Sequence, residues 1–310
     1  MRYQRLDLNL LTALRALLAE QNVTRAAQAM HVTQPAMSGI LSRLREYFGD
    51  PLITQVGRKM ELTPLARSLV GPVNDLLVRI DATLGIRPEF DPATTRRRFT
   101  LVASDYLVTV LLTDVLERVH REAPGVAIEL RQPAKESATQ LEAGEIDLLI
   151  TPEVFASGNH SAVNLFEDSY CAVVDRDHPE VGDSISLAQY IQLGHVVYEH
   201  MGKPFFESWF DRTHGEIRQV QVVTHTFGLL PQLVRGTRRI ATMHARAAAL
   251  LDASGPVRRV KLEFTVPHLV EVLQWHQARE LDPGAQWLRQ AIIDQAAALP
   301  PLSQLADLPG

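Results

Sequence analysis

The sequence predicts a chain of two unlike parts: an N-terminal all-α winged helix-turn-helix continued by a long linker helix, and a C-terminal α/β body. Three observations predict this fold class. Residues 23–48 form two short helical patterns around a tight turn, and residues 49–62 follow as a hairpin pattern. Residues 63–84 repeat apolar positions at helical spacing. From residue 98 onward, strand patterns alternate with helical ones, which is typical of an α/β domain.

The N-terminal winged helix-turn-helix region is called the head below. It is predicted to begin with a helix over residues 6–20, followed by the helix-turn-helix. Thr24 is expected to cap the first short helix, because its side-chain oxygen can accept a backbone N–H bond. His31 falls at the turn, where a left-handed backbone is often needed. Thr33 is the expected N-cap of the second short helix, and Pro35 fits its first turn, where a missing N–H costs nothing.

The second short helix has a polar and an apolar side. Gln34 and Ser38 lie on the polar side, and a helix N-terminus carrying them can meet base edges and phosphates in a major groove. The alternative is an ordinary two-helix corner in a core. The buried side is predicted at helical spacing, at Met37, Leu41, Leu44 and Phe48.

A hairpin, or wing, is predicted after this helix. Residues 49–53 indicate a turn into a short strand, and residues 56–62 indicate a basic tip and a return strand. Arg58 and Lys59 at the tip can clamp phosphates or probe a minor groove. The alternative for these two charges is a solvated turn.

Charge is divided unevenly along the chain. The 310 residues carry a formal net charge of −5, which taken whole argues against DNA binding. Residues 1–98, however, hold 14 Lys and Arg against 9 Asp and Glu, and the remainder holds 17 against 27. A basic head on an acidic body places a phosphate-bearing partner, double-stranded DNA, at the N-terminal end.

The linker helix over residues 63–84 carries an apolar seam with spacings of 4, 4, 3, 4 and 4. This pattern is typical of a coiled coil and predicts a homodimer. The alternative is a helix packed on its own domain. Gly71 and Pro72 interrupt the pattern and are expected to kink or locally break the helix. The predicted dimerisation residues are Leu65, Leu69, Val73, Leu76, Ile80 and Leu84.

Other function classes are disfavoured. The N-terminus has no early apolar run, and no stretch approaches the roughly 20 apolar residues of a membrane span, so we expect a cytoplasmic chain without a membrane partner. The one cysteine, Cys171, excludes an internal disulfide and falls in a predicted buried strand. The sequence has no HExxH motif, Cys–His cluster or Gly-x-Ser-x-Gly motif, so we expect no metal, no cofactor and no catalytic residue.

The C-terminal body is predicted to alternate strands and helices, and it is long enough for two subdomains. A Pro-rich linker around residues 87–92 and a basic run at residues 96–98 precede it. Strands are expected at 98–103, 126–131, 147–151, 169–174, 195–199, 218–223, 240–243 and 271–275, and helices at 106–121, 137–143, 187–192, 203–213, 227–234, 244–251 and 285–299.

A small-molecule site is expected where strands of this body end. In open α/β sheets, ligands gather at the carboxyl ends of strands, near helix N-termini. The alternative is that the polar residues there only cap helices and turns. The expected effector-binding residues are Ser104, Asp105, Thr151, His200, Met201, His225, Thr226 and Phe227.

In order and spacing, the head resembles the LysR-type transcriptional regulators. The matching blocks are residues 24–27, 33–38, 41–45, 48–53 and 57–64. Two positions depart from the family pattern: Gly39 replaces a long polar or basic residue after the recognition serine, and Leu65-Ala66 replaces Ala-Gly. The first departure removes the base contact that a long side chain would make there. The second does not bear on function.

The resemblance implies residue roles in DNA binding. Gln34, Pro35 and Ser38 would contact base edges, while Thr33 and Arg43 would join the wing in phosphate or groove contacts. Family members are commonly tetramers that activate transcription together with RNA polymerase. The DNA-binding set is Thr24, Thr33, Gln34, Pro35, Ser38, Arg43, Arg58 and Lys59.

For the body, the resemblance implies a periplasmic-binding-protein-like effector domain of two lobes joined by two crossover strands. Blocks at residues 193–197, 236–244, 274–276, 282–284 and 287–289 resemble the NodD/NahR-like subgroup, which responds to flavonoids, salicylate and other aromatics. A small aromatic effector between the lobes is therefore implied. The expected domains are 1–62 for DNA binding, 63–95 for the linker, 96–168 with 269–310 for the first lobe, and 169–268 for the second.

Two other functions fit parts of the sequence. A constitutive repressor would share the head but leave the cleft between the lobes without an effector. A solute-binding module would share the body, although the absence of an export signal disfavours it. A gel-shift experiment with and without aromatic compounds distinguishes an inducible activator from a constitutive repressor.

Overall fold

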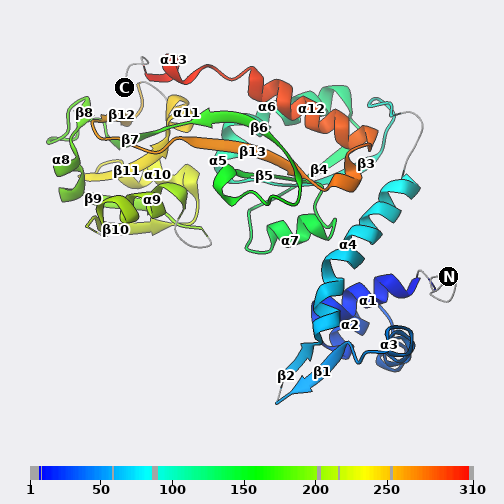
Figure 1. Ribbon diagram of the computed structural model, residues 1–310. Helices are drawn as coiled ribbons and strands as arrows, with labels where there is room; N and C mark the ends of the chain where they lie inside the picture. The colour runs from blue at the N-terminus through cyan, green and yellow to red at the C-terminus, as the bar shows by residue number, and fades with distance from the viewer. Residues whose placement is uncertain are drawn as a thin grey trace. The chain divides into compact units, whose positions relative to one another are not determined.

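The computed structural model describes residue 7 and residues 9–57, 59–85, 90–200, 204–215, 217–251 and 254–306. The head opens with α1 (Asn9–Glu20), α2 (Val23–Ala29) and α3 (Gln34–Phe48), which share one apolar core (Figure 1). The α2–turn–α3 unit is the helix-turn-helix that the sequence predicts. The expected start of the first helix at Leu6 lies outside the described residues.

The observed helix caps agree in part with those predicted from the sequence. Thr33 accepts a hydrogen bond from the backbone N–H of Ala36 at 3.4 Å and so caps α3, as predicted. His31 has a φ of 53°, the left-handed conformation expected of the turn. The prediction for Thr24 was wrong: Asn22 accepts the N–H of Arg25 at 3.0 Å and caps α2. Asn is as good an N-cap as Thr, and it stands directly before the first helical residue.

The wing is a short antiparallel hairpin of β1 (Ile53–Val56) and β2 (Lys59–Leu62). Asp50 fixes the base of this hairpin with one oxygen. Its Oδ1 accepts the backbone N–H of Leu52 at 2.6 Å and the hydroxyl of Thr63 at 2.7 Å. The carboxylate therefore ties the entry of the hairpin to its exit.

Arg45 anchors the same hairpin from α3. It is exposed on the helix, and its guanidinium donates to the carbonyls of Pro51 at 2.8 Å and Ile53 at 3.1 Å. Gly49 ends α3 in the left-handed conformation and returns its N–H to the Arg45 carbonyl at 2.8 Å. The wing is thus held to the recognition helix by both side chain and backbone.

Gly39 is an open position on α3. A Cβ built there would meet no atom within 4 Å. Replacing Gly39 by alanine is expected to raise the free energy of unfolding of the head by about 1 kcal/mol, because glycine inside a helix costs about that much relative to alanine. Thermal and urea unfolding of the two proteins measure the difference.

The control for this substitution is Gly49→Ala, at a residue whose φ is 65°. There the added Cβ forces a left-handed backbone on an L residue, so this variant should lose stability. An equal loss at both positions would contradict the assignment of Gly39 to an unstrained helical site.

The linker helix is α4 (Pro64–Gly85). Thr63 caps it by accepting the N–H of Ala66 at 3.1 Å. The helix runs without interruption through Pro72, so the local break expected at that proline does not occur. The ring still removes one backbone donor from the helix.

The first lobe of the body is a mixed sheet covered by helices. Its strand order is β4-β3-β5-β13-β6, with β3 parallel to β4 and β5, and β13 antiparallel to β5 and β6. The helices are α5 (Asp105–Leu107), the π-helical turn η2 (Val108–Leu112), α6 (Thr113–Glu122), α7 (Ser137–Glu142) and α12 (Pro283–Ala297). The strands are β3 (Arg97–Val102), β4 (Val126–Arg131), β5 (Leu148–Pro152), β6 (Ser161–Asp168) and β13 (Leu269–Trp275), and the turn η3 (Glu153–Phe155) follows β5.

The second lobe repeats the plan with the order β10-β9-β11-β7-β12-β8. Parallel pairs join β9 to β10 and β11, and β7 lies antiparallel to β11 and β12. The strands are β7 (Tyr170–Asp175), β8 (Ser184–Ile185), β9 (Gly194–Tyr198), β10 (Gln219–Thr224), β11 (Arg239–His244) and β12 (Val257–Leu262). The helices are α8 (Leu187–Gln192), α9 (Phe205–His214), η4 (Phe227–Leu229), α10 (Leu230–Val234) and α11 (Ala245–Ala249).

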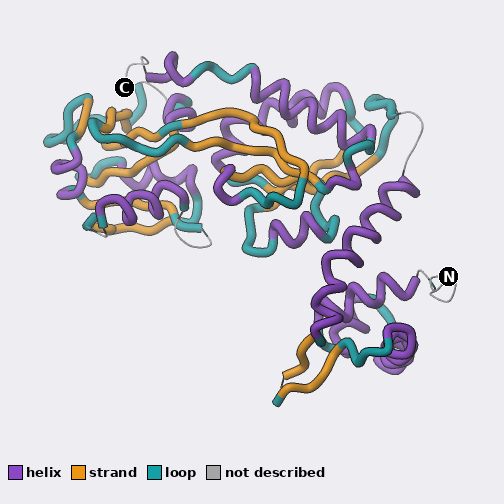
Figure 2. Tube along the Cα trace, viewed as in Figure 1, coloured by secondary structure: helices purple, strands orange, loops and turns teal. Residues whose placement is uncertain are grey.

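Two chain crossings join the lobes. The chain passes from β6 to β7 at Ser169, and it returns from β12 to β13 through residues 263–268. Figure 2 shows that strands and helices both run through each of the two lobes. One continuous apolar cluster runs through both lobes. The turn η5 (Gln277–Arg279) and the helix α13 (Leu302–Ala306) complete the described body.

The sequence patterns do not predict the strands β6, β8 and β12. They predict one helix over residues 106–121, where the structure has α5, the π-helical turn η2 and α6. Cys171 lies in β7 as expected, and burial raises the pKa of its thiol to about 12. No helix among the described residues is long and apolar enough to cross a membrane. Nor does any group of three or more His, Cys, Asp or Glu side chains in the described part of the chain form a metal site.

Candidate functional site

The predicted DNA-contacting residues lie on the surface of the head. Gln34 and Ser38 are exposed on α3, while Met37, Leu41 and Leu44 on its other side are buried. Arg58 lies outside the described residues. The remaining members of the set are also exposed: Thr24, Thr33, Pro35, Arg43 and Lys59.

The apolar seam of α4 divides between two environments. Val73 is buried in the core of its own head, where Leu69 also packs. Leu65 and Leu76 are exposed, and Ile80 is half-buried. The side chain of the last member, Leu84, lies outside the described residues. Dimerisation through this set stays a prediction.

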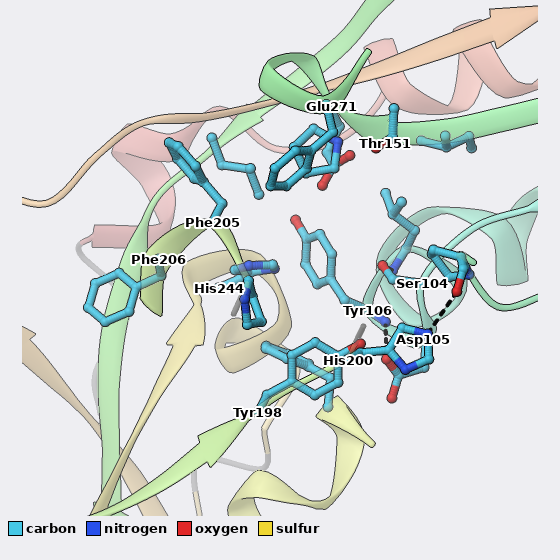
Figure 3. A pocket seen from close by; sticks show the side chains of 18 of the residues that line it. Ser104, Asp105, Tyr106, Thr151, Tyr198, His200, Phe205, Phe206, His244 and Glu271 are labelled. Atoms are coloured by element: carbon cyan, nitrogen blue, oxygen red, sulfur yellow. Dashed lines mark hydrogen bonds between the residues drawn. The ribbon is translucent and has the colours of Figure 1, made fainter. Parts of the chain in front are cut away.

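A cavity of about 410 Å³ opens between the two lobes of the body. It lies at the carboxyl ends of β3, β5, β9 and β11, the place the sheet rule predicts. Ser104 follows β3 and caps α5 by accepting the N–H of Leu107 at 3.4 Å. Figure 3 shows Ser104, Asp105 and Thr151 on one side of the cavity, with Tyr198 and His244 on the other.

The structure brings together five of the predicted effector residues: Ser104, Asp105, Thr151, His200 and Phe227 line the cavity. Met201 lies outside the described residues.

Two predicted effector residues, His225 and Thr226, are exposed and are not among the described lining residues. Instead, the ring of His225 hydrogen-bonds the carbonyl of Glu199, and the carbonyl of Thr226 accepts from the hydroxyl of Thr224. The prediction that these two residues line the cavity is therefore wrong.

Aromatic rings from both lobes form one wall. Tyr106 of the first lobe contacts Phe227 and His244 of the second, with ring centroids 5.7 and 3.9 Å apart. Tyr198 lies edge-on to Phe227 at 5.7 Å, and Tyr170 lies 5.0 Å from His244. Such a wall of rings suits a flat, apolar ligand.

Two hydrogen bonds cross the mouth of the cavity between the lobes. The backbone N–H of Gly228 donates to the Asp105 carboxylate at 3.2 Å. The His200 ring bonds the carbonyl of Pro133 at 2.8 Å. Side chains predicted to contact an effector therefore also hold one lobe against the other.

The inner end of the cavity carries a buried cluster of titratable groups. Asp168 is fully buried and accepts hydrogen bonds from the Tyr106 hydroxyl and from the N–H groups of Ser169, at 2.7 Å, and Arg246, at 3.3 Å. Burial raises the pKa of Asp168 to about 6, although these donors lower it. Burial, and then the negative charge of Asp168, raise the pKa of Glu271 to about 8.

His244 lies across from this cluster as a neutral ring. Burial lowers its pKa to about 3, and its Nδ1 has no hydrogen-bond partner among the described residues. At neutral pH the inner wall therefore holds an uncharged imidazole, an ionised Asp168 and a protonated Glu271.

Sequence reasoning missed several lining residues. His244 ends β11, and its place at a strand end is a signal in the sequence that it could line the cavity. Glu271 is a single charged residue inside the apolar run 269–275, and that contrast was a usable signal. No comparable signal marks the other missed lining residues, among them Tyr170, Phe205, Phe206, Thr242 and Leu269.

Comparison with known proteins identifies both parts of the chain. Residues 8–67 match the family of bacterial regulatory helix-turn-helix proteins of the lysR family, and residues 92–297 match the LysR substrate binding domain. Nodulation protein D 1 of Bradyrhizobium sp. (strain NC92) is 38% identical over 299 residues, which cover 96% of this chain and 95% of that protein.

Solved structures agree in fold. A probable transcriptional regulator from Pseudomonas aeruginosa, PA0477, is 28% identical, with a TM-score of 0.61, covering 94% of this chain and 97% of that one. Full-length OxyR from the same species has a TM-score of 0.69 at 18% identity, covering 93% and 94% of the two chains, and shows the fold alone. A DNA-reading head, a two-lobed ligand-binding body and these matches lead to one conclusion: the chain belongs to the LysR family of DNA-binding transcriptional regulators and is not an enzyme.

Proposed function

We propose that this regulator responds to a small aromatic effector bound between its lobes, and that it activates transcription. The cavity walled by rings from both lobes carries the proposal. A ligand that contacts both lobes has different affinities for different lobe arrangements, and that difference shifts the equilibrium between them. The likeness to nodulation protein D supports an aromatic effector, because the subgroup it resembles responds to such compounds.

For the head, we propose that Gln34, Pro35 and Ser38 contact base edges. Phosphate or groove contacts are assigned to Thr33, Arg43, Arg58 and Lys59, and Thr24 is a further proposed DNA-binding residue. Pairing of α4 in a homodimer would place two heads on successive operator half-sites, and two dimers would make a tetramer.

For the whole chain, we propose the domain limits 1–62, 63–95, 96–168 with 269–310, and 169–268. The match of a family model to residues 8–67 and of another to 92–297 supports this division. RNA polymerase is the proposed protein partner and the cytoplasm the proposed location, because the chain would act at promoters.

The effector proposal is tested with the full chain and the DNA upstream of its own gene. The chain is titrated with a flavanone and with salicylate while its melting temperature and its gel-shift pattern are followed. We expect an aromatic compound to raise the melting temperature and to change the mobility or footprint of the DNA complex. A constitutive repressor would bind the DNA with no response to any aromatic, and that result would overturn the effector proposal.

The roles assigned within the head give two different expected outcomes. Gln34→Ala should narrow the difference in affinity between operator and unrelated DNA, because a base contact is lost. Lys59→Ala should weaken both complexes alike and reduce the slope of log K against log salt by about one unit or less. Fluorescence anisotropy at several salt concentrations measures both quantities. Equal loss of selectivity from the two substitutions would contradict the assigned roles.

A further inference from the structure

An unpaired carboxyl oxygen stands in the wall of the cavity. The Glu271 residue is 2% exposed, and its Oε2 has no hydrogen-bond partner among the described residues. It lines the cavity from the interior of β13, on the side facing Tyr106 in Figure 3. A buried polar atom without a hydrogen-bond partner lowers the stability of the fold. Such an atom marks a point where a ligand can restore the missing hydrogen bond.

The charges around Glu271 are already balanced without it. Asp168 is ionised and takes its three donors as described above, and the positive charge of Arg246 lies near it. The Arg246 guanidinium itself donates to the carbonyls of Glu167 at 3.0 Å and Pro300 at 2.7 Å. Arg246 and Asp168 thus offset each other, and Glu271 has no cation of its own in this cluster.

The rest of the described wall adds little positive charge. Among the described lining residues, Lys135 is the one Lys or Arg, and it is exposed. His244 is uncharged. The remaining charged lining groups are the carboxylates of Asp105 and Glu207. A ligand at the inner end therefore meets an apolar, acid-rich surface.

We propose that Glu271 acts as a neutral carboxylic acid that donates a hydrogen bond to an oxygen of the effector. The wall around it then selects uncharged aromatic molecules that carry an acceptor oxygen, and it excludes aromatic carboxylates. This inference rests on the proposed aromatic effector and names its charge and the residue that recognises it.

The exclusion has a direct electrostatic cause. A ligand carboxylate beside Glu271 would be desolvated next to the negative charge of Asp168, without a facing cation to replace its water. A ligand cation would need Glu271 to ionise, and this adds a second buried negative charge beside Asp168. A ketone, ester or phenol oxygen accepts a hydrogen bond from the Glu271 O–H without either cost.

Three isosteric probes test the charge rule on the full chain: 4-acetylbiphenyl, biphenyl-4-carboxylate and biphenyl-4-carboxamidine. They are neutral, anionic and cationic, and otherwise share one shape. Binding is measured by calorimetry at pH 7 for the native chain, Glu271→Gln, Glu271→Leu and the control Glu167→Gln. Glu167 lies on β6 beside the same strand but is exposed, so its substitution makes the same Glu-to-Gln replacement outside the cavity.

We expect the native chain to bind the ketone at least about tenfold more tightly than either charged probe, which corresponds to one buried hydrogen bond or charge mismatch. Glu271→Leu should weaken ketone binding by about tenfold, since it removes the donor. Glu271→Gln should keep it within about threefold, because an amide also donates. Glu167→Gln should match the native chain.

Several results would overturn the inference. Equal or tighter binding of the carboxylate means that a cation serves the site, and tighter binding of the amidine means that Glu271 is a counterion. Undiminished ketone binding by Glu271→Leu removes Glu271 from recognition. If the carboxylate binds and alters the DNA complex, only the inference fails. If no aromatic probe binds, the proposed aromatic effector fails with it.

Discussion

Replacing Arg218 by methionine should lower the free energy of unfolding by about 3–5 kcal/mol, the cost of leaving buried carboxylates without their cation. The Arg218 side chain is only 5% exposed. Its Nη2 donates to Glu207 and lies 3.5 Å from an oxygen of Asp211. The guanidinium also lies 4.4 Å from the centroid of the Phe210 ring. Burial already raises the pKa of Glu207, and Arg218 lowers it.

The measurement is urea unfolding at pH 7, with Arg212→Met as the matched control on the same helix. Arg212 is exposed, and its Nε donates to the carbonyl of Ser208 at 3.1 Å, so its loss should change stability by less than about 0.5 kcal/mol. Adding Glu207→Gln to Arg218→Met should recover part of the loss. Unfolding midpoints that coincide for Arg218→Met and Arg212→Met would show that the buried pair contributes nothing.

Replacing Glu271 by glutamine should stabilise the chain in alkaline solution and leave it nearly unchanged in acid. The folded pKa of about 8 lies above the unfolded value of 4.5, so the fold favours the protonated form. The stability that depends on this proton is fully present below pH 4.5 and is lost as the pH rises to 8. Above pH 8 the variant should be more stable than the native chain by about 3–5 kcal/mol.

The titratable and charged groups that face Glu271 do not reverse the predicted loss of stability with rising pH. They come from each element around the cluster, and Asp168 is the one whose charge raises the Glu271 pKa. Free energies of unfolding at pH 5 and pH 8.5 measure the effect, with Glu167→Gln as the control. A parallel pH profile for the native chain and Glu271→Gln would contradict a protonated Glu271. The facing groups are Tyr106 on α5, Asp168 on β6, Tyr170 on β7, His244 on β11 and Arg246 at the start of α11.

Much of the fold was predictable because local patterns decide it. The recognition helix has its first-turn proline and its apolar spacing within its own 15 residues and its cap directly before them, so the sequence alone predicts it. Strand β12 was missed because Val257–Leu262 contains three basic residues. Arg258 donates to the carbonyls of Arg176 and Gly182, contacts that no local pattern reveals.

The sequence predicted only those residues of the candidate site that lie at the ends of predicted strands. Ser104, Thr151 and His200 follow or end strands, and simple topology brings strand ends together. The sequence pattern predicts a strand over residues 271–275, with Glu271 as its first residue. The structure places it third in β13, where the Asp168 environment lets it stay uncharged. That environment comes from another strand, 103 residues earlier in the chain.

The two chain crossings stand at the inner end of the cavity. Asp168 is the last residue of β6 before the first crossing, and Glu271 is two residues beyond the start of β13, just after the second. A ligand bound to Glu271, as proposed above, would act beside the two crossings, while the Asp105 and His200 hydrogen bonds join the lobes at the opposite side of the cavity (Figure 3). Displacement grows with distance from a pivot, so a shift of a fraction of an ångström at Glu271 becomes a larger movement at the far ends of the lobes. The proposed effector would then bind next to the hinge between the lobes, where a small displacement has its largest effect on their relative orientation.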